Sequence, residues 1–380
     1  MTSINVQNNI RNEELKNYPK MSINSIPCRF KLMISSTNGA FGKCLFLLLL
    51  LFQNSMYFNP LMKISLDSVF SIEPKSIVIF LIQNSGISFF HFNYNHNFLR
   101  QIDDYWNELQ IDFDYETRKY FWTQMAIGRS FTIILYIIIF TLNYSYLFYA
   151  WYQEKTYSSK DFSLDDVFNY VFHIIFGPVA YYNFYCQSCV LIDLLILAQT
   201  ALQFNAIKLK KLYKESVKDD KILNIDVIAD LRKKYLSTHR LVDKINEIMS
   251  PSLFLIFMLF VSNSCDLFYA LIFLEHHLLI KLNRTIRCVL GLILLLKIAH
   301  LAIQVYAKSQ ELLMTVYKTS LKTDSIRILN QITLFLNCNE IGFSFGGLFM
   351  LTTSSLSTLF SILTTIVIAI PSFNKHENTH

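Results

Sequence analysis

Charged residues are scarce in this chain. Asp, Glu, Lys and Arg together make up 16% of its 380 residues, whereas 53% of the residues are hydrophobic. A soluble domain usually carries about 25% charged residues, because its surface faces water. Gly and Pro, which destabilise helices, are also few, at 9 and 7 residues. The composition therefore excludes an ordinary soluble domain and predicts an all-α integral membrane protein.

Motifs that carry catalysis or hold a metal are missing as well. None of the nine glycines belongs to a GxGxxG or Walker loop, and no nucleophile elbow surrounds a serine. Cys186 and Cys189 form a CxxC without a second pair, which we interpret as two small core residues. We therefore expect no enzymatic activity, no metal and no cofactor. The net charge of +6 is too weak a signal to predict a nucleic-acid partner.

A removable signal peptide is also absent, because residues 1–38 are polar and contain no short hydrophobic region with a cleavage site. We expect these residues to form a cytosolic tail that precedes seven membrane-spanning helices. A span needs about 20 apolar residues. The predicted spans are 41–58, 76–92, 121–151, 171–202, 251–273, 288–306 and 341–373. Two polar stretches, 207–249 and 308–340, are predicted to be cytosolic helical segments.

Lys and Arg are distributed unevenly between the two sides of this predicted protein. Most of the 34 lie in the N-terminal tail and in the loops after the second, fourth and sixth spans. Because loops rich in Lys and Arg stay in the cytoplasm, we expect a cytoplasmic N-terminus and an extracellular C-terminus, the reverse of a G protein-coupled receptor. On this topology the sequon Asn283-Arg284-Thr285 lies in an extracellular loop, so Asn283 is a glycosylation candidate.

The last hydrophobic segment, 341–373, contains no charged residue. Its first part has small residues in GxxxG spacing, which lets another helix approach closely: Gly342, Gly346 and Gly347. Hydroxyl side chains then recur every three or four residues and so lie on one face of a helix: Ser354, Ser357, Ser361 and Thr365. Two interpretations stay open from these residues alone. The helix lines an aqueous pore, or its hydroxyls bond back to their own helix inside a bundle.

Charged residues inside the predicted spans are costly in lipid and are therefore candidates for a function. Arg129 lies near the cytosolic end of the third span, where its side chain can reach the interface. Asp193, Asp266 and Lys297 lie deeper. We expect one Asp to pair with Lys297 and to stabilise the bundle, and the sequence leaves open which of the two it is.

Several local sequences resemble the insect odorant receptor family, and the resemblance is sharpest from His239 onward. They stand before the fifth span, at the end of the fourth and in the C-terminal third: His239, Leu241, Val242, Ile245, Asn246, Ser250–Phe254, Gln203-Phe204, Tyr317, Arg327–Ile332 and Phe343–Phe349. Two positions depart from family patterns. Leu321 stands where odorant receptors usually have Trp, and Ile366 and Ser372 stand where gustatory receptors have Tyr and Gln.

The resemblance implies a volatile-ligand-gated, non-selective cation channel in the plasma membrane of an olfactory sensory neuron dendrite. Such receptors are tetramers in which a variable odorant-binding subunit joins a shared co-receptor subunit. Their last helices line the pore, and the stretches corresponding to 207–249 and 308–340 pack together as a cytosolic anchor. By position, Ile366 and Ile370 resemble the hydrophobic gate. The alternative is a gustatory receptor channel that acts without the co-receptor.

In the family the odorant binds in the outer half of the membrane, between the second, third, fourth and sixth spans. A small volatile needs apolar surface and one or two hydrogen-bonding groups, and Tyr offers both. Carried over by depth, the pocket candidates are Phe80, Gln83, Phe140, Tyr144, Tyr146, Phe176, Tyr181, Tyr182, Tyr185, Leu290 and Ile293. Because aromatic residues are 15% of the chain, we expect fewer than half of these to touch ligand.

Overall fold

The computed structural model describes most of the chain beyond residue 95. The described ranges are 96–111, 114–157, 164–219, 225–273, 278–323 and 325–377, together with isolated positions before residue 96. The predicted tail 1–38 and the first two predicted spans lie outside the described residues, apart from a few of those positions. The remaining five spans can be compared with the structure.

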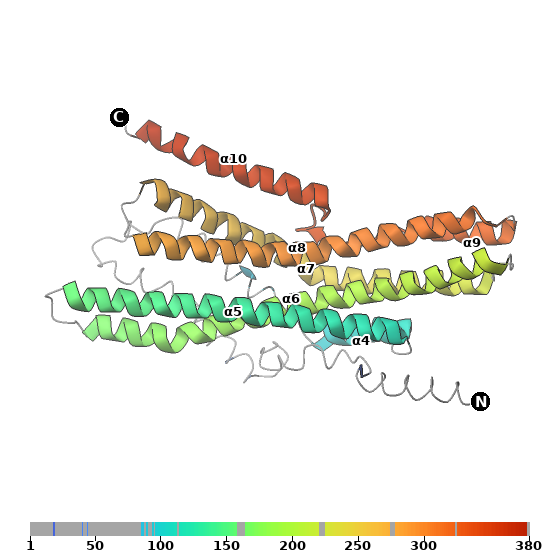
Figure 1. The fold of residues 1–380 in the computed structure, drawn as a ribbon, viewed down its shortest axis with the longest axis horizontal. Helices are drawn as coiled ribbons and strands as arrows, with labels where there is room; N and C mark the ends of the chain where they lie inside the picture. The colour runs from blue at the N-terminus through green and yellow to red at the C-terminus, as the bar shows by residue number, and fades with distance from the viewer. Residues whose placement is uncertain are drawn as a thin grey trace.

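Four long helices run along the length of the molecule (Figure 1). They are α5 (Tyr115–Tyr157), α6 (Leu164–Asp219), α7 (Ile225–Phe273) and α8 (Leu278–Ser320). In the described part of the chain these four contain the segments long and apolar enough to cross a membrane. With 43 residues, α5 measures about 65 Å at 1.5 Å per residue, roughly twice a hydrocarbon core of about 30 Å. Each helix therefore extends well beyond a bilayer.

The polar stretches 207–249 and 308–340 belong largely to these same helices. Residues 207–219 form the last part of α6, residues 225–249 form the first part of α7, and residues 308–320 form the last part of α8. The shorter helix α9 (Ile326–Leu336) then folds back along α8 and buries Ile328, Ile332 and Phe335. The structure thus has helices over most of both stretches, and most of these segments are extensions of the long helices rather than separate elements.

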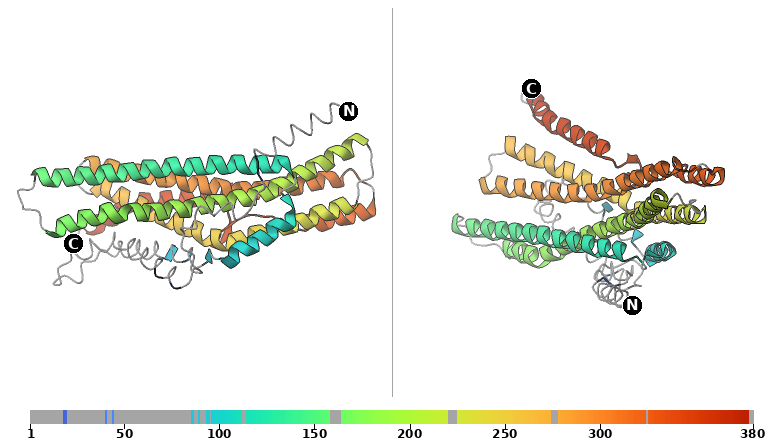
Figure 2. Two further views of the ribbon diagram at one scale, coloured as in Figure 1. Left: turned by 90° about the horizontal axis from the view of Figure 1, so that it is seen from below. Right: turned by 45° about the vertical axis from the view of Figure 1, so that its right-hand side comes forward.

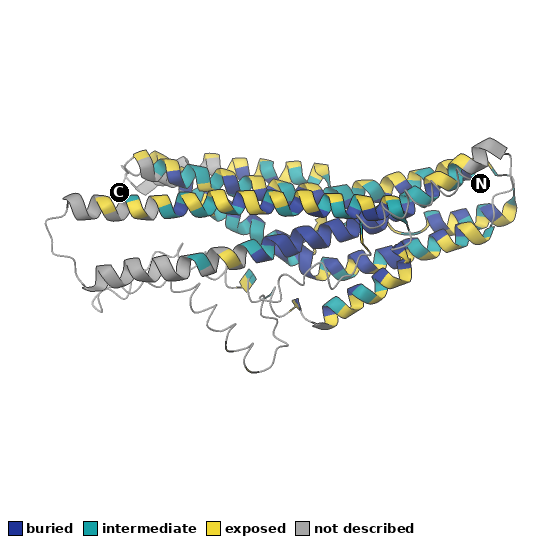
Figure 3. Cartoon of the chain, turned by 60° about the horizontal axis from the view of Figure 1, so that its bottom comes forward, coloured by how far each residue is buried: buried dark blue, intermediate teal, exposed yellow. Residues whose placement is uncertain are grey.

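Helix α6 is the centre of the bundle. Every residue from 188 to 202 is buried, and α6 packs against α5, α7 and α8. Figure 3 shows this stretch in dark blue along the middle of the molecule. A helix that is apolar on all sides is stable only where other helices surround it. Cys189 lies within this stretch and Cys186 lies just before it. Each is 1% exposed and neither is in a disulfide, so their interpretation as core residues is confirmed.

A polar junction ties α5, α6 and α8 together within this core. The Gln199 side chain, fully buried on α6, donates to the Leu301 carbonyl at 2.8 Å and to Gln304 Oε1 at 3.1 Å. Its own oxygen accepts a bond from the Tyr120 hydroxyl at 3.1 Å. Lys308 donates in turn to that hydroxyl at 2.7 Å. Buried amide groups need partners, so these bonds fix how the three helices lie against one another.

The outer face of α5 carries large apolar side chains that nothing in the fold covers. Ile127, Ile134 and Ile137 are at least half exposed, and Ile133 and Ile138 are exposed as well. An apolar surface of this kind is costly in water but favourable against lipid tails. This face of α5, on a helix long and apolar enough to cross a membrane, is therefore suited to contact lipid.

Helix α4 (His96–Leu109) lies in what the sequence predicted to be a loop after the second span. Its apolar residues Phe98, Ile102 and Trp106 follow at steps of four and are at most 3% exposed. They pack on α7, while the acidic residues Asp103 and Asp104 belong to the more exposed side. The periodicity of 3.6 that defines an amphipathic helix is present in this segment.

The structure corrects the expected start of the last helix. Helix α10 spans Thr353–Glu377, and residues 341–352 are not helical. Strands β1 (Ser344–Phe345) and β2 (Phe349–Met350) form an antiparallel hairpin. Gly346 and Gly347 make its turn with φ angles of +60° and +74°, a conformation that suits glycine. These glycines therefore serve a tight turn and not the helix packing predicted from their GxxxG spacing.

Helix α10 begins where it does because its first turn is capped. The Thr352 Oγ1 accepts a bond from the Ser355 N–H at 3.1 Å, and the Ser355 Oγ accepts one from the Thr352 N–H at 2.7 Å. This reciprocal pair satisfies N–H groups that have no partner within a helix, as in a capping box. Gly342, Gly346 and Gly347 all precede this cap. The segment 341–352 is named the connector below.

Helix α10 stands apart from the other helices. In Figure 1 and in the right-hand view of Figure 2 it leans away from the bundle, starting beside the hairpin. Its main neighbour is α7. Among its described side chains, Leu359 and Leu363 are the buried ones, at 8% and 9% exposure. Most of the surface of α10 is therefore uncovered within a single chain.

Candidate functional site

A row of aromatic rings joins α5 to α6. Tyr136, Phe140 and Tyr144 follow at steps of four along α5, with ring centroids 6.0 Å and 4.3 Å apart. The centroid of the Tyr136 ring lies 4.9 Å from that of Tyr185 on α6. The Tyr185 ring lies in turn 6.3 Å from the ring of Tyr182. These five residues are named the aromatic row. Contacts at these distances are worth about 0.5–1.5 kcal/mol per pair beyond the burial of the rings.

The aromatic row contains four of the predicted pocket residues and one that was not predicted. Phe140, Tyr144, Tyr182 and Tyr185 lie in it, and Tyr136 lies between them. The signal for Tyr136 was present in the sequence, since it precedes Phe140 by four residues and Tyr144 by eight, which is one helix face. Tyr182 is 40% exposed and the others are half-buried. The row is thus accessible in part and offers hydroxyl groups beside apolar ring faces.

The other predicted pocket residues are not brought into this row by the described contacts. Leu290 belongs to the hydrophobic core of α8 at 8% exposure, and Ile293 is 40% exposed on the same helix. Tyr146 lies on α5, and Phe176 and Tyr181 lie on α6, with side chains outside the described set. Phe80 and Gln83 lie outside the described residues. Their membership of a pocket stays a prediction.

The buried charges pair differently from the prediction. Asp193, 2% exposed, accepts a hydrogen bond from Arg129 at 3.0 Å and forms an ion pair across α5 and α6. Lys297 instead places its ammonium 5.9 Å from the centre of the Phe131 ring. Asp193 is therefore not the partner of Lys297, because it is paired with Arg129, and a pairing of Lys297 with Asp266 stays a prediction. Asp266 lies on α7 with its side chain outside the described set.

The hydroxyl stripe of α10 faces away from the bundle. Its four predicted residues are exposed: Ser354, Ser357, Ser361 and Thr365. Ser361 and Thr365 donate to the carbonyls one turn earlier, at 3.0 Å and 2.9 Å. The two interpretations from sequence thus overlap, since the hydroxyls bond back to their own helix and yet lie on a free surface. Thr358 and Thr364 extend this surface and were not singled out.

The gate candidates lie further along the same helix. Ile366 is 42% exposed, and Ile370 lies on α10 with its side chain outside the described set. Ile368 follows Thr365 by three residues and is 69% exposed, so the hydroxyl stripe passes into an apolar stretch. An exposed apolar stretch after a hydroxyl face needs either lipid or another helix beside it.

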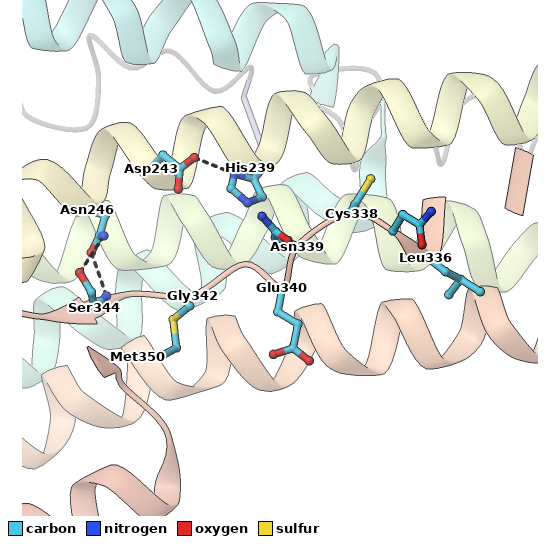
Figure 4. Close-up of a pocket in the computed structure, with 11 residues that line it drawn as sticks. His239, Asp243, Asn246, Leu336, Cys338, Asn339, Glu340, Gly342, Ser344 and Met350 are labelled. Carbon is cyan, nitrogen blue, oxygen red and sulfur yellow. Dashed lines mark hydrogen bonds and ion pairs between the residues drawn. The ribbon is translucent and has the colours of Figure 1, made fainter. Parts of the chain in front are cut away.

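A polar cavity of about 680 Å³ lies between α7 and the connector. In Figure 4 the ion-paired His239 and Asp243 lie on its α7 side, with His239 Nδ1 and Asp243 Oδ2 2.6 Å apart. Glu340 and Met350 extend from the opposite side of the connector. Burial raises the pKa of the Cys338 thiol, which therefore stays protonated near neutral pH and is a poor nucleophile.

The glycosylation candidate Asn283 lies within α8 and is 8% exposed. Thr285 of the same sequon donates to the Lys281 carbonyl, one turn earlier on α8. A glycan needs an acceptor amide that protrudes into solvent. The structure therefore does not favour use of this sequon, because Asn283 lies in α8 and not in the predicted loop.

These observations describe a membrane bundle with a partly open aromatic row and a detached, hydroxyl-bearing last helix. A sequence model described as 7tm Chemosensory receptor matches residues 26–370. The chain belongs to this chemosensory receptor family. No protein with a curated description matches the chain.

Solved structures agree with this family. The receptor is similar to the insect olfactory receptor OR5 from Machilis hrabei in complex with eugenol, with a TM-score of 0.68 and 12% identity. The similarity covers 92% of this chain and 97% of that one. A second structure of OR5 from Machilis hrabei gives a TM-score of 0.60 with 11% identity over 88% and 89% of the two chains. At such identities the similarity establishes the fold, which is that of an insect olfactory receptor.

Proposed function

We propose that this chemosensory receptor is an odorant receptor that forms a volatile-ligand-gated, non-selective cation channel together with a shared co-receptor subunit. The observation that carries the proposal is the free hydroxyl surface of α10. Ser354, Ser357, Ser361 and Thr365 are exposed on a helix that has few contacts within its own chain. A hydroxyl face in the membrane is stable beside water or beside other polar helices. Several copies of α10 around one axis would enclose such a face.

The aromatic row is the proposed odorant site. It combines ring faces with the hydroxyls of Tyr136, Tyr182 and Tyr185, which suits a small volatile with one polar group. The structure of OR5 from Machilis hrabei is of a complex with eugenol, a small volatile molecule. This supports a ligand of similar size here without identifying it. The remaining pocket candidates complete the proposal: Phe80 and Gln83 on the second span, Leu290 and Ile293 on the sixth, and Tyr146, Phe176 and Tyr181 on the third and fourth.

Assembly with a co-receptor is supported by apolar residues in the polar halves of α8 and α9. Met314 and Tyr317 are 59% and 49% exposed at a three-residue step on α8, and Leu321, in the turn after this helix, is 70% exposed. Ile326 and Leu334 of α9 are exposed as well. Because these residues lie among Lys, Glu and Gln, they face water in a single chain. Burial against another subunit would remove this cost.

The proposed arrangement has seven spans in the plasma membrane, with the N-terminus in the cytoplasm and the C-terminus outside. Residues 207–249 and 308–340 form the cytosolic anchor. Ile366 and Ile370 form the gate, which closes when apolar side chains exclude water from a narrow passage. The chemistry is conduction and not catalysis, which agrees with a family of receptors.

The test is whole-cell current from cells that express this chain with or without an insect odorant co-receptor. A panel of volatiles that includes eugenol is applied, and surface protein is quantified by biotinylation. Volatile-evoked cation current that requires the co-receptor is the expected result. Current from this chain alone would contradict the co-receptor requirement and favour the gustatory alternative. If no current is evoked with or without the co-receptor, although the protein is at the surface, the result would count against the channel unless a gate variant conducts.

The gate variant is Ile366→Ser, which is expected to produce a current without ligand because a polar side chain keeps the constriction wet. Ile134→Ser, at an exposed isoleucine on the lipid face of α5, is the matched control and should produce none. Absence of leak in the first variant, with normal surface protein, would remove Ile366 from the gate.

A further inference from the structure

The first part of the connector is packed against the core and hydrogen-bonded to the long helices. Ile341, Phe343 and Phe345 alternate toward the core and are at most 5% exposed, as expected for an extended chain with one buried face. The Ile341 N–H donates to Ser309 Oγ of α8 at 2.8 Å. Near its start, the Asn339 carbonyl accepts a bond from the Tyr235 hydroxyl at 3.1 Å. Residues 341–345 of the connector are therefore packed on and bonded to the core, whereas residues 346–350 are exposed.

Asn246 of α7 holds the hairpin by two bonds to a single residue. Its side-chain oxygen accepts a bond from the Ser344 N–H at 3.0 Å, and its amide donates to Ser344 Oγ at 3.0 Å (Figure 4). A side-chain amide has the same donor and acceptor as a peptide group. Asn246 thus takes the place that a neighbouring strand would have beside β1.

Ser250, one turn later on α7, holds the other end of the hairpin. Its carbonyl accepts a bond from the Gly346 N–H at 3.1 Å, and its hydroxyl accepts one from the Gly347 N–H at 2.8 Å. Ser344 Oγ donates to the same hydroxyl at 2.9 Å. The N–H groups of the glycine turn, which would otherwise be without partners, are bonded to α7.

Ring packing reinforces these bonds from the apolar side. The Phe345 ring makes edge contacts with Phe254 and Phe257 of α7, with centroids 5.6 Å and 5.5 Å apart. It also stacks on Phe349 across the hairpin at 5.4 Å. A Cβ atom on Gly346 would lie 3.2 Å from the Phe254 ring, so the turn lies directly against α7. The hairpin is therefore attached to α7 both by hydrogen bonds and by ring packing.

The hairpin leads directly into α10, which leans away from the bundle and has α7 as its main neighbour. The position of α10 is therefore set by its attachment to α7 at the hairpin. We infer that Asn246 and Ser250 are positioning residues that join the hairpin and the first turn of α10 to α7 as one rigid joint. Through this joint a displacement of α7 moves α10. The statement about movement rests on the proposed function, whereas the joint itself does not.

Hydrogen exchange of the full-length receptor in detergent tests the joint without a ligand. The amides of Ser344, Gly346 and Gly347 are expected to exchange slowly in the parent. Asn246→Ala should raise the exchange rate at Ser344, and Ser250→Ala that at Gly347, by about tenfold each, because each loses its acceptor. Ser250→Thr keeps the hydroxyl and should stay within about twofold of the parent. Fast exchange in the parent, or no change in the two Ala variants, would overturn the joint.

Ser252→Ala is the matched control, because Ser252 is a buried serine on the same helix and takes no part in the bonds described above. Its exchange at the hairpin should equal that of the parent. If Ser250→Ala does not reach the membrane, the pair Ser250→Cys and Ser344→Cys replaces it. Because their hydroxyl oxygens are 2.9 Å apart, mild oxidation should join the two cysteines, as detected by mass spectrometry. Failure to cross-link would contradict the joint.

Currents of the cross-linked receptor with the co-receptor test the transmission of movement. The probe is the panel volatile that evokes the largest current from the parent. A rigid joint does not open during gating, so current should be the same within about twofold before and after reduction of the disulfide. Combined Asn246→Ala and Ser250→Ala should lower the maximal current per surface receptor several-fold, while Ser252→Ala should not. Current that appears only after reduction would overturn the rigid joint.

The two proposals fail in distinguishable ways. A parent receptor that is silent to every volatile, with slow exchange and efficient cross-linking, would leave the joint standing and contradict the channel. A parent that conducts, with fast exchange at Ser344 and Gly347, would leave the channel standing and contradict the joint.

Discussion

At the scale of single residues, the ion pair between Arg129 and Asp193 joins α5 to α6. The carboxylate is 2% exposed and its partner 24% exposed, so the pair lies between α5 and α6 rather than on a surface. Removing one partner of a buried pair leaves an unpaired charge, which costs about 3–5 kcal/mol. Replacing both partners costs far less, because no charge then remains in the interior.

We therefore expect Arg129→Gln to lower the unfolding temperature of the detergent-purified receptor clearly, by an amount corresponding to about 3 kcal/mol. The double variant with Asp193→Asn should recover most of the loss. Lys297→Met is the control, because a single ammonium beside a ring contributes about 1 kcal/mol or less. An equal decrease of the unfolding temperature in Arg129→Gln and Lys297→Met would show that the ion pair contributes no more to stability than the Lys297 side chain does.

At the scale of helices, the close contact of α5 with α6 depends on Gly128. A Cβ atom there would lie 2.9 Å from Ile192 Cγ2 and 3.0 Å from Ile196 Cδ1. Both isoleucines are buried at 1% exposure in the central run of α6. Because this run is packed on all sides, its side chains have little room to move aside.

Gly128→Ala is therefore expected to destabilise the receptor by about 1–3 kcal/mol through overpacking. Gly291→Ala on α8 is the matched substitution, since nothing lies within 4 Å of its added Cβ. It should be neutral or stabilising by up to about 1 kcal/mol, because Ala favours a helix over Gly. Thermal unfolding in detergent measures both. A stabilised Gly128→Ala variant would mean that α5 and α6 can separate without cost.

The helices themselves were predictable where their apolar pattern is long, and less so elsewhere. The third to sixth predicted spans each correspond to a long helix. The last one begins twelve residues later than expected, because Gly346 and Gly347 adopt positive φ and Thr352 caps the helix. A run of uncharged residues indicates burial or membrane, but it does not distinguish a buried extended strap from the start of a helix.

At the scale of the whole molecule, the two ends of the bundle differ in chemistry. Helices α4 and α9, with the polar halves of α6, α7 and α8, lie at one end, and the C-terminal end of α10 lies at the other (Figure 1). From the Lys and Arg of the polar halves we predict, by the positive-inside rule, that the first end is cytoplasmic. On this prediction the C-terminus lies on the opposite side of the membrane.

An epitope tag after His380 should accordingly be stained on intact cells, whereas a tag before Met1 should require permeabilisation. Both should be stained equally once the membrane is opened, which serves as the internal control. A C-terminal tag that stays hidden on intact cells, with the N-terminal tag exposed, would reverse the topology and remove the basis for the proposed channel orientation.

The sequence by itself determined that this chain is a helical membrane protein, and local residues from His239 onward indicated the receptor family. Through that resemblance, and by their expected depth in the membrane, it also placed Phe140, Tyr144, Tyr182 and Tyr185 among the pocket candidates. Which of those residues touch a ligand stays a prediction.

Only the tertiary structure decided the partners. It showed that Asp193 binds Arg129, that Tyr136 joins the aromatic row, and that Asn246 and Ser250 hold the hairpin before α10. Arg129 and Asp193 lie 64 positions apart in the chain, and Asn246 and Ser250 lie 98 and 97 positions from their hairpin partners. Contacts between distant segments depend on how helices rotate and slide as they pack, and that is settled by the summed shape and polarity of all their faces.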